Sequence, residues 1–135
     1  MAGDVVLVVE DNVRNMTLLR DVLRATGYRT LEASTGGEAL ALAALHTPAL
    51  VLMDIRLPDM DGTEALRRLR RDARTASVPV LALTAQAMKG DRERFLEAGF
   101  DGYLPKPVDL DELLAAIRRH CGAGRSAGRP RSSAL

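Results

Sequence analysis

The chain has 135 residues, the length of one ordinary domain, and its 47% apolar and 27% charged residues are a normal globular share. The formal net charge of +1 argues against a chain built to bind nucleic acid, and its single cysteine excludes an internal disulfide framework. No apolar run approaches the roughly 20 residues of a membrane span and no signal peptide opens the chain, so we expect a cytoplasmic protein.

Strands and helices are predicted to alternate along the chain. Apolar runs predict strands at Val5–Val9, Tyr28–Ala33, Ala49–Met53, Val78–Leu83 and Asp101–Leu104. Helical spacing and end signals predict helices from the Asn12 cap to Gly27, from Ser34 or Thr35 to just before Pro48, and over Gly62 to about Asp72, Ala87–Ala98 and Asp109–His120. Five βα repeats with apolar strands predict an α/β fold, a doubly wound five-stranded parallel sheet with helices on both faces.

Charged residues inside this pattern receive structural interpretations. The arginines at 67, 68, 70 and 71 are expected to form a solvated face of the third helix. We expect Asp59 and Asp61 to shape the loop after the third strand and to cap the helix that begins near Gly62, rather than to bind metal. Residues 1–121 form the predicted domain, and the Gly-, Ser-, Ala- and Arg-rich segment 122–135 is expected to be a disordered basic tail.

Polar side chains follow four of the predicted strands. Glu10 and Asp11 come after the first strand, Asp54 after the third, Thr84 after the fourth and Lys106 after the fifth. In a parallel sheet these positions meet at the carboxyl edge, where binding crevices of such sheets lie. Three carboxylates at close range repel one another, and a hard divalent cation relieves that repulsion. The pattern therefore predicts a Mg²⁺ site with open coordination positions.

Beside such a metal, Asp54 has a chemical use. A carboxylate can attack phosphorus and hold the phosphoryl group as an acyl phosphate. Catalysis of that transfer consists of placement and charge neutralisation, for which Lys106 offers an ammonium and Thr84 a hydroxyl group, helped by the backbone N–H of Ala85.

The residues VVEDN (8–12), LMDIRLPDMDG (52–62), LTA (83–85) and LPKP (104–107) resemble the receiver domain of response regulators in two-component signalling. The resemblance covers residues from about 4 to 121, and VEDN-x-x-NM with LTAQAMKGD is most similar to stand-alone regulators of the DivK type and to receivers of hybrid kinases. It implies the flavodoxin-like receiver fold with strand order 2-1-3-4-5. It also implies that Glu10, Asp11, Asp54 and the backbone carbonyl of Arg56 hold Mg²⁺.

The same resemblance implies a signalling role rather than enzymatic turnover. Asp54 is expected to accept a phosphoryl group from a histidine kinase or a histidine phosphotransfer protein, with slow self-dephosphorylation. Thr84 and Tyr103 are the expected switch, and the face formed by the fourth helix, fifth strand and fifth helix is expected to bind a downstream protein. Lys106–Pro107 is a candidate cis peptide. We expect no direct DNA or membrane binding, and a monomer or a phosphorylation-dependent dimer. The 14 residues after the last helix are too few for an output domain.

Three other interpretations compete with a stand-alone receiver. An aspartyl-phosphate phosphatase of the haloacid-dehalogenase type would need an acid two residues after the nucleophile, where this chain has Arg56. A flavodoxin-like cofactor carrier would need a Ser/Thr/Gly-rich phosphate loop, where this chain has the acidic sequence EDNVRN. A receiver that is a fragment of a larger kinase stays open, with 122–135 as a linker remnant.

Overall fold

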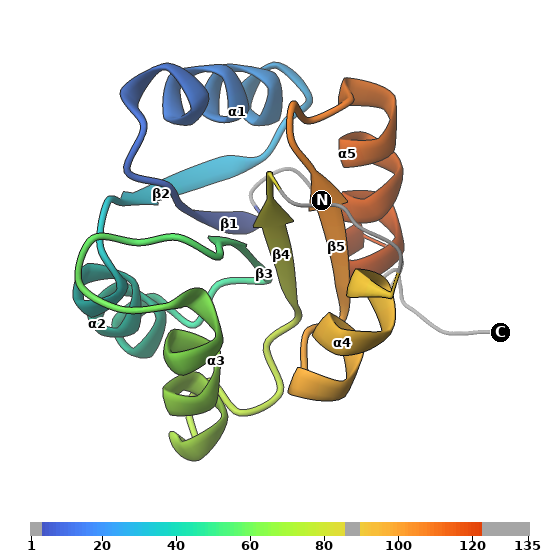
Figure 1. The fold of residues 1–135 in the computed structure, drawn as a ribbon. Helices are drawn as coiled ribbons and strands as arrows, with labels where there is room; N and C mark the ends of the chain where they lie inside the picture. Colours follow the sequence, from blue (N-terminus) through green and yellow to red (C-terminus); the bar gives the residue numbers. More distant parts are fainter. Residues whose placement is uncertain (1–3, 86–89, 123–135) are drawn as a thin grey trace, which may run out of the picture.

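The structure, a computed structural model, describes residues 4–85 and 90–122. Its elements in chain order are β1 (Val5–Val9), α1 (Val13–Ala25), β2 (Arg29–Ala33), α2 (Gly36–His46), β3 (Leu50–Asp54), α3 (Gly62–Arg71), β4 (Val80–Thr84), α4 (Asp91–Ala98), β5 (Gly102–Pro105), α5 (Leu110–Ile117) and a π-helical turn over Arg118–Gly122 (Figure 1). None of the helices described is long and apolar enough to cross a membrane. The predicted tail lies outside the described residues except for Gly122, whose backbone belongs to the π-helical turn.

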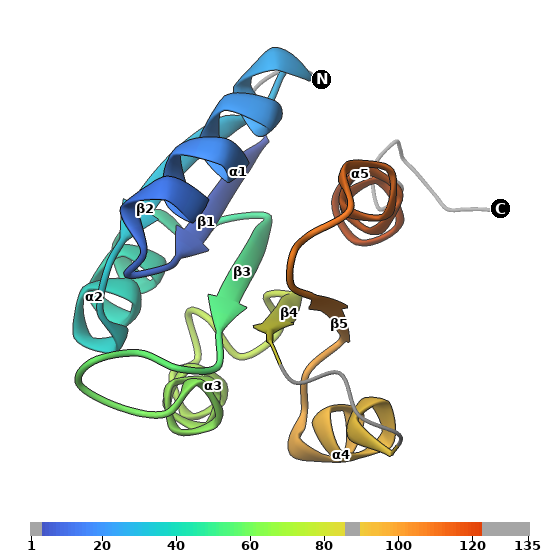
Figure 2. The ribbon, with the colours of Figure 1, turned by 45° about the horizontal axis from the view of Figure 1, so that its top comes forward.

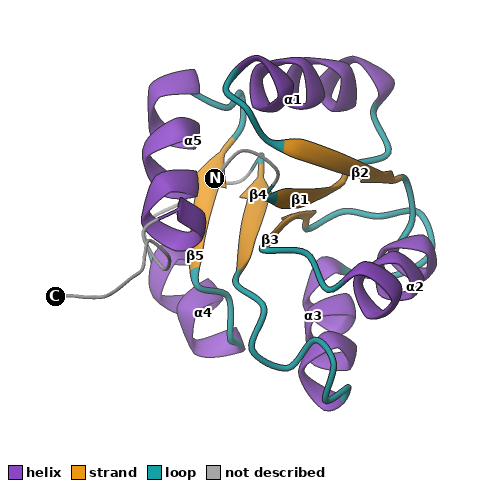
Figure 3. Cartoon of the chain, turned by 180° about the vertical axis from the view of Figure 1, so that it is seen from behind, coloured by secondary structure: helices purple, strands orange, loops and turns teal. Residues whose placement is uncertain are grey.

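The five strands form one parallel sheet in the order β2-β1-β3-β4-β5, as predicted. Helices α1 and α5 cover one face, and α2, α3 and α4 cover the other (Figures 2 and 3). Every residue of β3 and β4 is buried, because successive side chains of a central strand point into the two opposite cores. Leu7 and Val51 face α2 and α3, whereas Val8 and Leu52 face α1 and α5.

Side-chain caps fix where several helices begin, as the sequence predicted. Asn12 accepts a hydrogen bond from Asn15 N at 3.0 Å, which starts α1. Asp109 accepts one from Glu112 N at 3.0 Å, which starts α5. Each cap satisfies an N–H group that has no acceptor within its helix. Gly27 follows α1 with a φ of 98°, the left-handed geometry that glycine adopts without strain.

Several boundaries differ by a residue or more from the predicted ones, and two of these differences have a clear physical reason. The fourth helix was predicted to run from Ala87, but Gly90 has a φ of 91° and the helix begins at Asp91; residues 87–89 lie outside the described part of the chain. The fourth strand begins at Val80 instead of Val78, because Pro79 has no N–H to donate and Val78 N closes a turn on the Thr75 carbonyl at 3.2 Å.

Arg70 corrects the prediction that all four arginines of α3 face solvent. Its guanidinium donates to the carbonyl oxygens of Val78 at 2.6 Å and Gly99 at 3.3 Å, and to Asp101 Oδ2 at 3.1 Å. Asp101 Oδ2 also accepts the N–H of Val80 at 2.8 Å. Arg70 therefore joins the end of α3 to the starts of β4 and β5, which a pattern of charged residues on a helix could not reveal.

We expect Arg70→Ala to lower the free energy of unfolding by about 1–3 kcal/mol, because it removes hydrogen bonds to partly buried carbonyl and carboxylate groups. The neighbouring Arg71 is exposed, so Arg71→Ala should change stability by no more than about 0.5 kcal/mol. Urea denaturation of both variants measures the difference. Equal effects would contradict the structural role of Arg70.

Candidate functional site

The sheet register brings the predicted site residues to one edge. Val9 pairs with Met53, so the residues that follow them, Glu10 and Asp54, end up side by side. Thr84 is the last residue of β4, and its carbonyl accepts a hydrogen bond from Lys106 N at 2.7 Å. Four side chains that are far apart in the sequence therefore meet where β1, β3, β4 and β5 end.

Glu10, Asp11 and Asp54 form the carboxylate cluster of this edge. Each contributes one oxygen to a group in which all oxygens lie within 4.8 Å of one another. Glu10 and Asp54 are only 2% and 5% exposed, whereas Asp11 is exposed. Hydrogen bonds to backbone N–H groups orient both buried carboxylates, from Asn12 to Glu10 Oε2 at 3.1 Å and from Arg56 to Asp54 Oδ1 at 3.0 Å.

Lys106 places one ammonium between the two buried carboxylates. Its Nζ donates to Asp54 Oδ2 at 2.9 Å and lies 2.8 Å from Glu10 Oε1. The second contact is an ion pair without hydrogen-bond geometry, so Glu10 Oε1 is buried with no hydrogen bond from the described residues. The Lys106–Pro107 peptide is cis, which confirms that expectation.

The electrostatics of the cluster follow from burial. Burial raises the pKa of the Glu10 carboxyl above its ordinary value, and neighbouring Asp54 adds to this effect while Lys106 opposes it. Burial alone would lower the pKa of Lys106, but its hydrogen bond to Asp54 and its ion pairs with Asp54 and Glu10 outweigh burial and raise it. Lys106 is therefore a fixed positive charge, and among the described residues it is the only cation paired with any of the three clustered carboxylates.

This donor set fits a hard divalent cation. Mg²⁺ takes oxygen ligands from carboxylates, backbone carbonyls and water, and usually keeps part of its coordination shell for other ligands. Glu10 and Asp54 supply two oriented carboxylates, and Asp11 supplies an exposed third. Glu10 Oε1 is in addition buried without a hydrogen bond from the described residues, so these groups meet that requirement. Glu10, Asp11 and Asp54 are thus competent metal ligands, and Arg56 lies in the same cavity.

A cavity of about 400 Å³ opens above the cluster. The predicted residues that line it are Glu10, Asp11, Asp54, Arg56, Thr84, Ala85 and Lys106. Sequence reasoning missed Arg94 and Phe95 of α4, which also line it; the Arg94 guanidinium carbon lies 5.1 Å from the Phe95 ring centre, and Arg94 pairs with Asp91 at 2.9 Å. No motif marked them, because an exposed helical arginine has no signal in the sequence.

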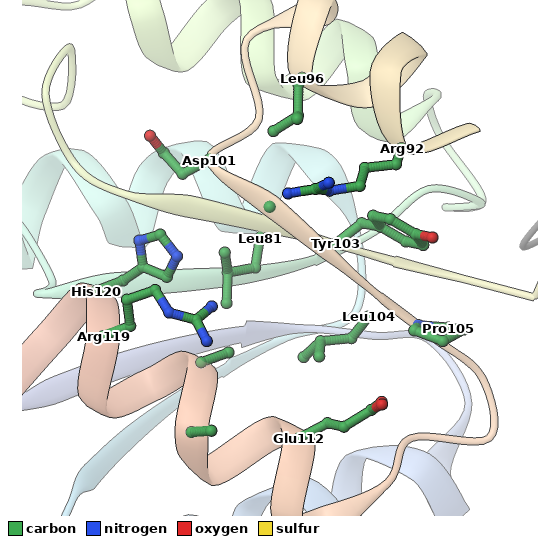
Figure 4. Close-up of a pocket in the computed structure, with 13 residues that line it drawn as sticks. Leu81, Arg92, Leu96, Asp101, Tyr103, Leu104, Pro105, Glu112, Arg119 and His120 are labelled. Carbon is green, nitrogen blue, oxygen red and sulfur yellow. The ribbon is translucent and has the colours of Figure 1, made fainter. Parts of the chain in front are cut away.

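Tyr103 lies outside this cavity. Its ring packs against Phe95, with ring centres 5.9 Å apart, and it lines a separate groove between α4 and α5 (Figure 4). Tyr103 pairs with Ala82 on β4, two residues before Thr84, so Tyr103 and Thr84 project toward the same face of the sheet. Tyr103 and Thr84 therefore lie on the same face of the sheet but line different cavities. Phe95 packs against Tyr103 and also lines the cavity that contains Thr84.

Asp59 and Asp61 both act as helix caps, but on different helices. Asp61 caps α3, accepting from Thr63 N at 2.7 Å, as predicted. Asp59 accepts from Gly36 N at 2.8 Å and Gly37 N at 2.9 Å, so it binds the start of α2 rather than that of α3. Neither belongs to the carboxylate cluster found among the described residues.

Comparison with known proteins assigns the class. Residues 6–118 match the response regulator receiver domain, and the chain belongs to this family. Its relatives include the polar-differentiation response regulator DivK of Brucella ovis, which is 44% identical over 117 residues that cover 87% of this chain and 95% of DivK.

Solved receiver domains share the fold. The receiver domain of sensor histidine kinase PA1611 from Pseudomonas aeruginosa has a TM-score of 0.83 and 41% identity, covers 90% of this chain and all 100% of its own, and was solved with a magnesium ion in its active-site cleft. Chemotaxis protein CheY4 of Vibrio cholerae has a TM-score of 0.81 and 28% identity, over 88% of this chain and 99% of its own. The chain is thus a receiver domain of the signalling class.

The charge balance of the site yields a stability prediction. Because the pKa of Glu10 is raised in the folded state, its ionisation opposes folding as the pH rises through that pKa. Without metal at pH 7, Glu10→Gln should therefore melt about 2–4 °C above the wild type, and the difference should disappear at low pH, where Glu10 is protonated.

With Mg²⁺ present, the wild type should melt above Glu10→Gln. At about 100 times its Kd, a ligand of the folded state stabilises by about 2.7 kcal/mol, and Glu10→Gln should lose most of this gain. Thermal melts with chelator and with Mg²⁺ measure both effects, with the exposed Glu97→Gln as control. A wild type that is more stable than Glu10→Gln in chelator at pH 7 would contradict the electrostatic account.

Proposed function

We propose that this receiver domain accepts a phosphoryl group on Asp54 from a phosphohistidine of a histidine kinase or a histidine phosphotransfer protein. The observation that carries the proposal is the position of Asp54: it lies within 4.8 Å of two further carboxylates, 2.9 Å from Lys106 Nζ, and in the wall of an open cavity. The likeness to DivK and to a magnesium-containing receiver supports the same role.

In the proposed transfer an Asp54 carboxylate oxygen attacks phosphorus, the P–O bond forms, and the P–N bond to the donor histidine breaks. Glu10, Asp11, Asp54 and the Arg56 carbonyl would hold Mg²⁺, which supplies Lewis-acid neutralisation of the phosphoryl charge. Forming the acyl phosphate removes the negative charge of the carboxylate that Lys106 pairs with. Lys106 is then available to pair with a phosphoryl oxygen, without leaving the cavity.

Thr84 would convert this chemistry into a change of shape. The phosphoryl group brings a charge of roughly −1.5 to −2 and strong acceptor oxygens, and Thr84 and Ala85, which line the same cavity, would offer it a hydroxyl and a backbone N–H. A shift of Thr84 toward the phosphoryl group would open space on the face that Tyr103 shares, and Tyr103 would move inward. Because the contact between Thr84 and the phosphoryl group would form in only one of the two conformations, phosphorylation can shift the equilibrium toward that conformation.

The output would be the surface formed by α4, β5 and α5. This surface contains the groove of about 460 Å³ beside Tyr103, with Arg92 on the α4 side and Glu112 and Arg119 on the α5 side (Figure 4). An apolar floor with charged walls suits a protein partner rather than DNA. We propose that the protein is a cytoplasmic signalling protein, and that it is a monomer, or a dimer when phosphorylated. We also propose that it does not turn over substrate, because Arg56 stands where a phosphatase of the haloacid-dehalogenase type has its second acid.

Incubation with a small phosphodonor and Mg²⁺ should add the mass of one phosphoryl group to the wild type. Asp54→Asn and excess chelator should each abolish the gain, because one removes the nucleophile and the other the neutralising cation. Intact-protein mass spectrometry measures it, and Asp111→Asn serves as a control, because Asp111 is exposed on α5 and lies outside the carboxylate cluster. A full mass gain in Asp54→Asn would exclude Asp54 as the acceptor.

Thr84→Ala should separate phosphorylation from signalling. We expect it still to be fully phosphorylated on prolonged incubation with donor and Mg²⁺, because Asp54, Lys106 and the metal ligands stay in place. Amide NMR shifts of β5 and α4 upon phosphorylation, large in the wild type, should largely disappear. Wild-type shifts around Tyr103 in phosphorylated Thr84→Ala would rule out the proposed switch.

A further inference from the structure

The loop between β3 and α3 carries Arg56, and its two ends are held firmly. Gly62 N donates to the Ile55 carbonyl at 2.8 Å, and Arg56 pairs with Asp61 in an isolated antiparallel bridge. A side chain at Gly62 would lie 2.6 Å from the Asp54 carbonyl oxygen, so only glycine lets the loop close this tightly. These contacts leave the tip of the loop, residues 57–60, to be held by something else.

The tip runs out from the sheet edge to the start of α2 before it returns to α3 (Figures 1 and 2). There the two carboxylate oxygens of Asp59 accept from Gly36 N at 2.8 Å and from Gly37 N at 2.9 Å. These N–H groups belong to the first two residues of α2 and have no acceptor within the helix. Thr35 Oγ1 takes the next one, from Glu38 N at 3.1 Å. Asp59 thus completes the capping of α2 from 22 or more residues away in the sequence.

Shape reinforces this contact. A Cβ atom at Gly36 would lie 2.6 Å from Met60 Cγ and 2.8 Å from Met60 Sδ, so the Met60 side chain occupies the space that any other residue at position 36 would fill. The side chains of Leu57 and Met60 also pack against the core on the α2 and α3 side of the sheet. Pro58, between Leu57 and Asp59, restricts its own φ and the conformation of Leu57. The segment from Arg56 to Asp59 therefore has little freedom while Asp59 is bound.

We propose that Asp59 is a positioning residue of the site: by fastening the tip of the β3–α3 loop to α2, it holds the Arg56 backbone carbonyl where Mg²⁺ requires a ligand. The inference rests on the proposed function, since it assumes that the cluster of Glu10, Asp11 and Asp54 binds the metal. Mg²⁺ tolerates little deviation from octahedral geometry, so a ligand on a loosened loop loses affinity rather than being replaced. Groups that orient metal ligands typically contribute about tenfold or more to metal affinity.

Asp59→Ala tests the proposal, and Glu38→Ala is its matched control. Glu38 is also an exposed carboxylate bound at the start of α2, where it accepts from Ser34 N at 2.8 Å, but it makes no hydrogen bond to the β3–α3 loop. Both variants lose one negative charge and one helix-capping group. Only Asp59→Ala releases the loop.

Calorimetric titration with Mg²⁺ should give a Kd about tenfold weaker for Asp59→Ala and within about twofold of wild type for Glu38→Ala. Asp59→Asn keeps one acceptor oxygen, so its Kd for Mg²⁺ should lie between those of the wild type and Asp59→Ala. The phosphorylation rate of Asp59→Ala at saturating Mg²⁺ should equal that of the wild type, because no reacting group is lost. Amide exchange of Gly36 and Gly37 in the absence of metal should become faster in Asp59→Ala.

An unchanged Mg²⁺ affinity in Asp59→Ala, or an equal loss in Glu38→Ala, would overturn the proposal. A lower phosphorylation rate of Asp59→Ala that saturating Mg²⁺ does not restore would also overturn it. If the wild type gains no phosphoryl group, the proposed function fails instead, and the Mg²⁺ affinities of the variants still decide the role of Asp59.

Discussion

The functional site depends on clustered negative charge that is largely buried, so that water screens it poorly. Glu10 and Asp54 are almost fully buried, Asp11 stands beside them, and the ammonium of Lys106 is too little charge to balance all three. Removing a carboxylate from water costs several kcal/mol unless charges and hydrogen bonds compensate. The cluster therefore carries excess negative charge by itself, and a bound dication would compensate it.

The fold supplies this arrangement through its parallel sheet, which joins segments that are distant in the sequence. Parallel strands covered on both faces deliver their last residues to one edge, so buried apolar runs place Glu10, Asp54 and Thr84 without any side chain having to reach far. Lys106 directly follows the edge strand β5, and its ammonium reaches across to Glu10 and Asp54. Outside the sheet edge, Asp59 binds the β3–α3 loop to the start of α2 through two hydrogen bonds. In our proposal α2 therefore helps to position the site, although it contributes no metal ligand.

The sequence was informative wherever a local rule applied. The strand runs, the caps Asn12 and Asp109, the strand order and the meeting of Glu10, Asp11, Asp54 and Lys106 were all predicted, because each follows from periodicity, backbone hydrogen-bonding rules or the family motif. For α2 the sequence left Ser34 and Thr35 open as caps, and the structure has Thr35. Contacts between distant side chains were not. Arg70 was predicted to face solvent and Asp59 to cap the nearer helix, and only the tertiary structure shows the partners that each one reaches.

The most direct test is a Mn²⁺ titration of the ¹⁵N-labelled protein followed by amide NMR, since paramagnetic broadening falls steeply with distance from the ion. We expect one site, with broadening centred on the amides of Glu10, Asp11, Asp54 and Arg56 and weaker at Thr84 and Lys106, and reversed by excess Mg²⁺. Broadening centred on other acidic surfaces, or none at metal concentrations that saturate a magnesium-containing receiver such as that of PA1611, would contradict the account.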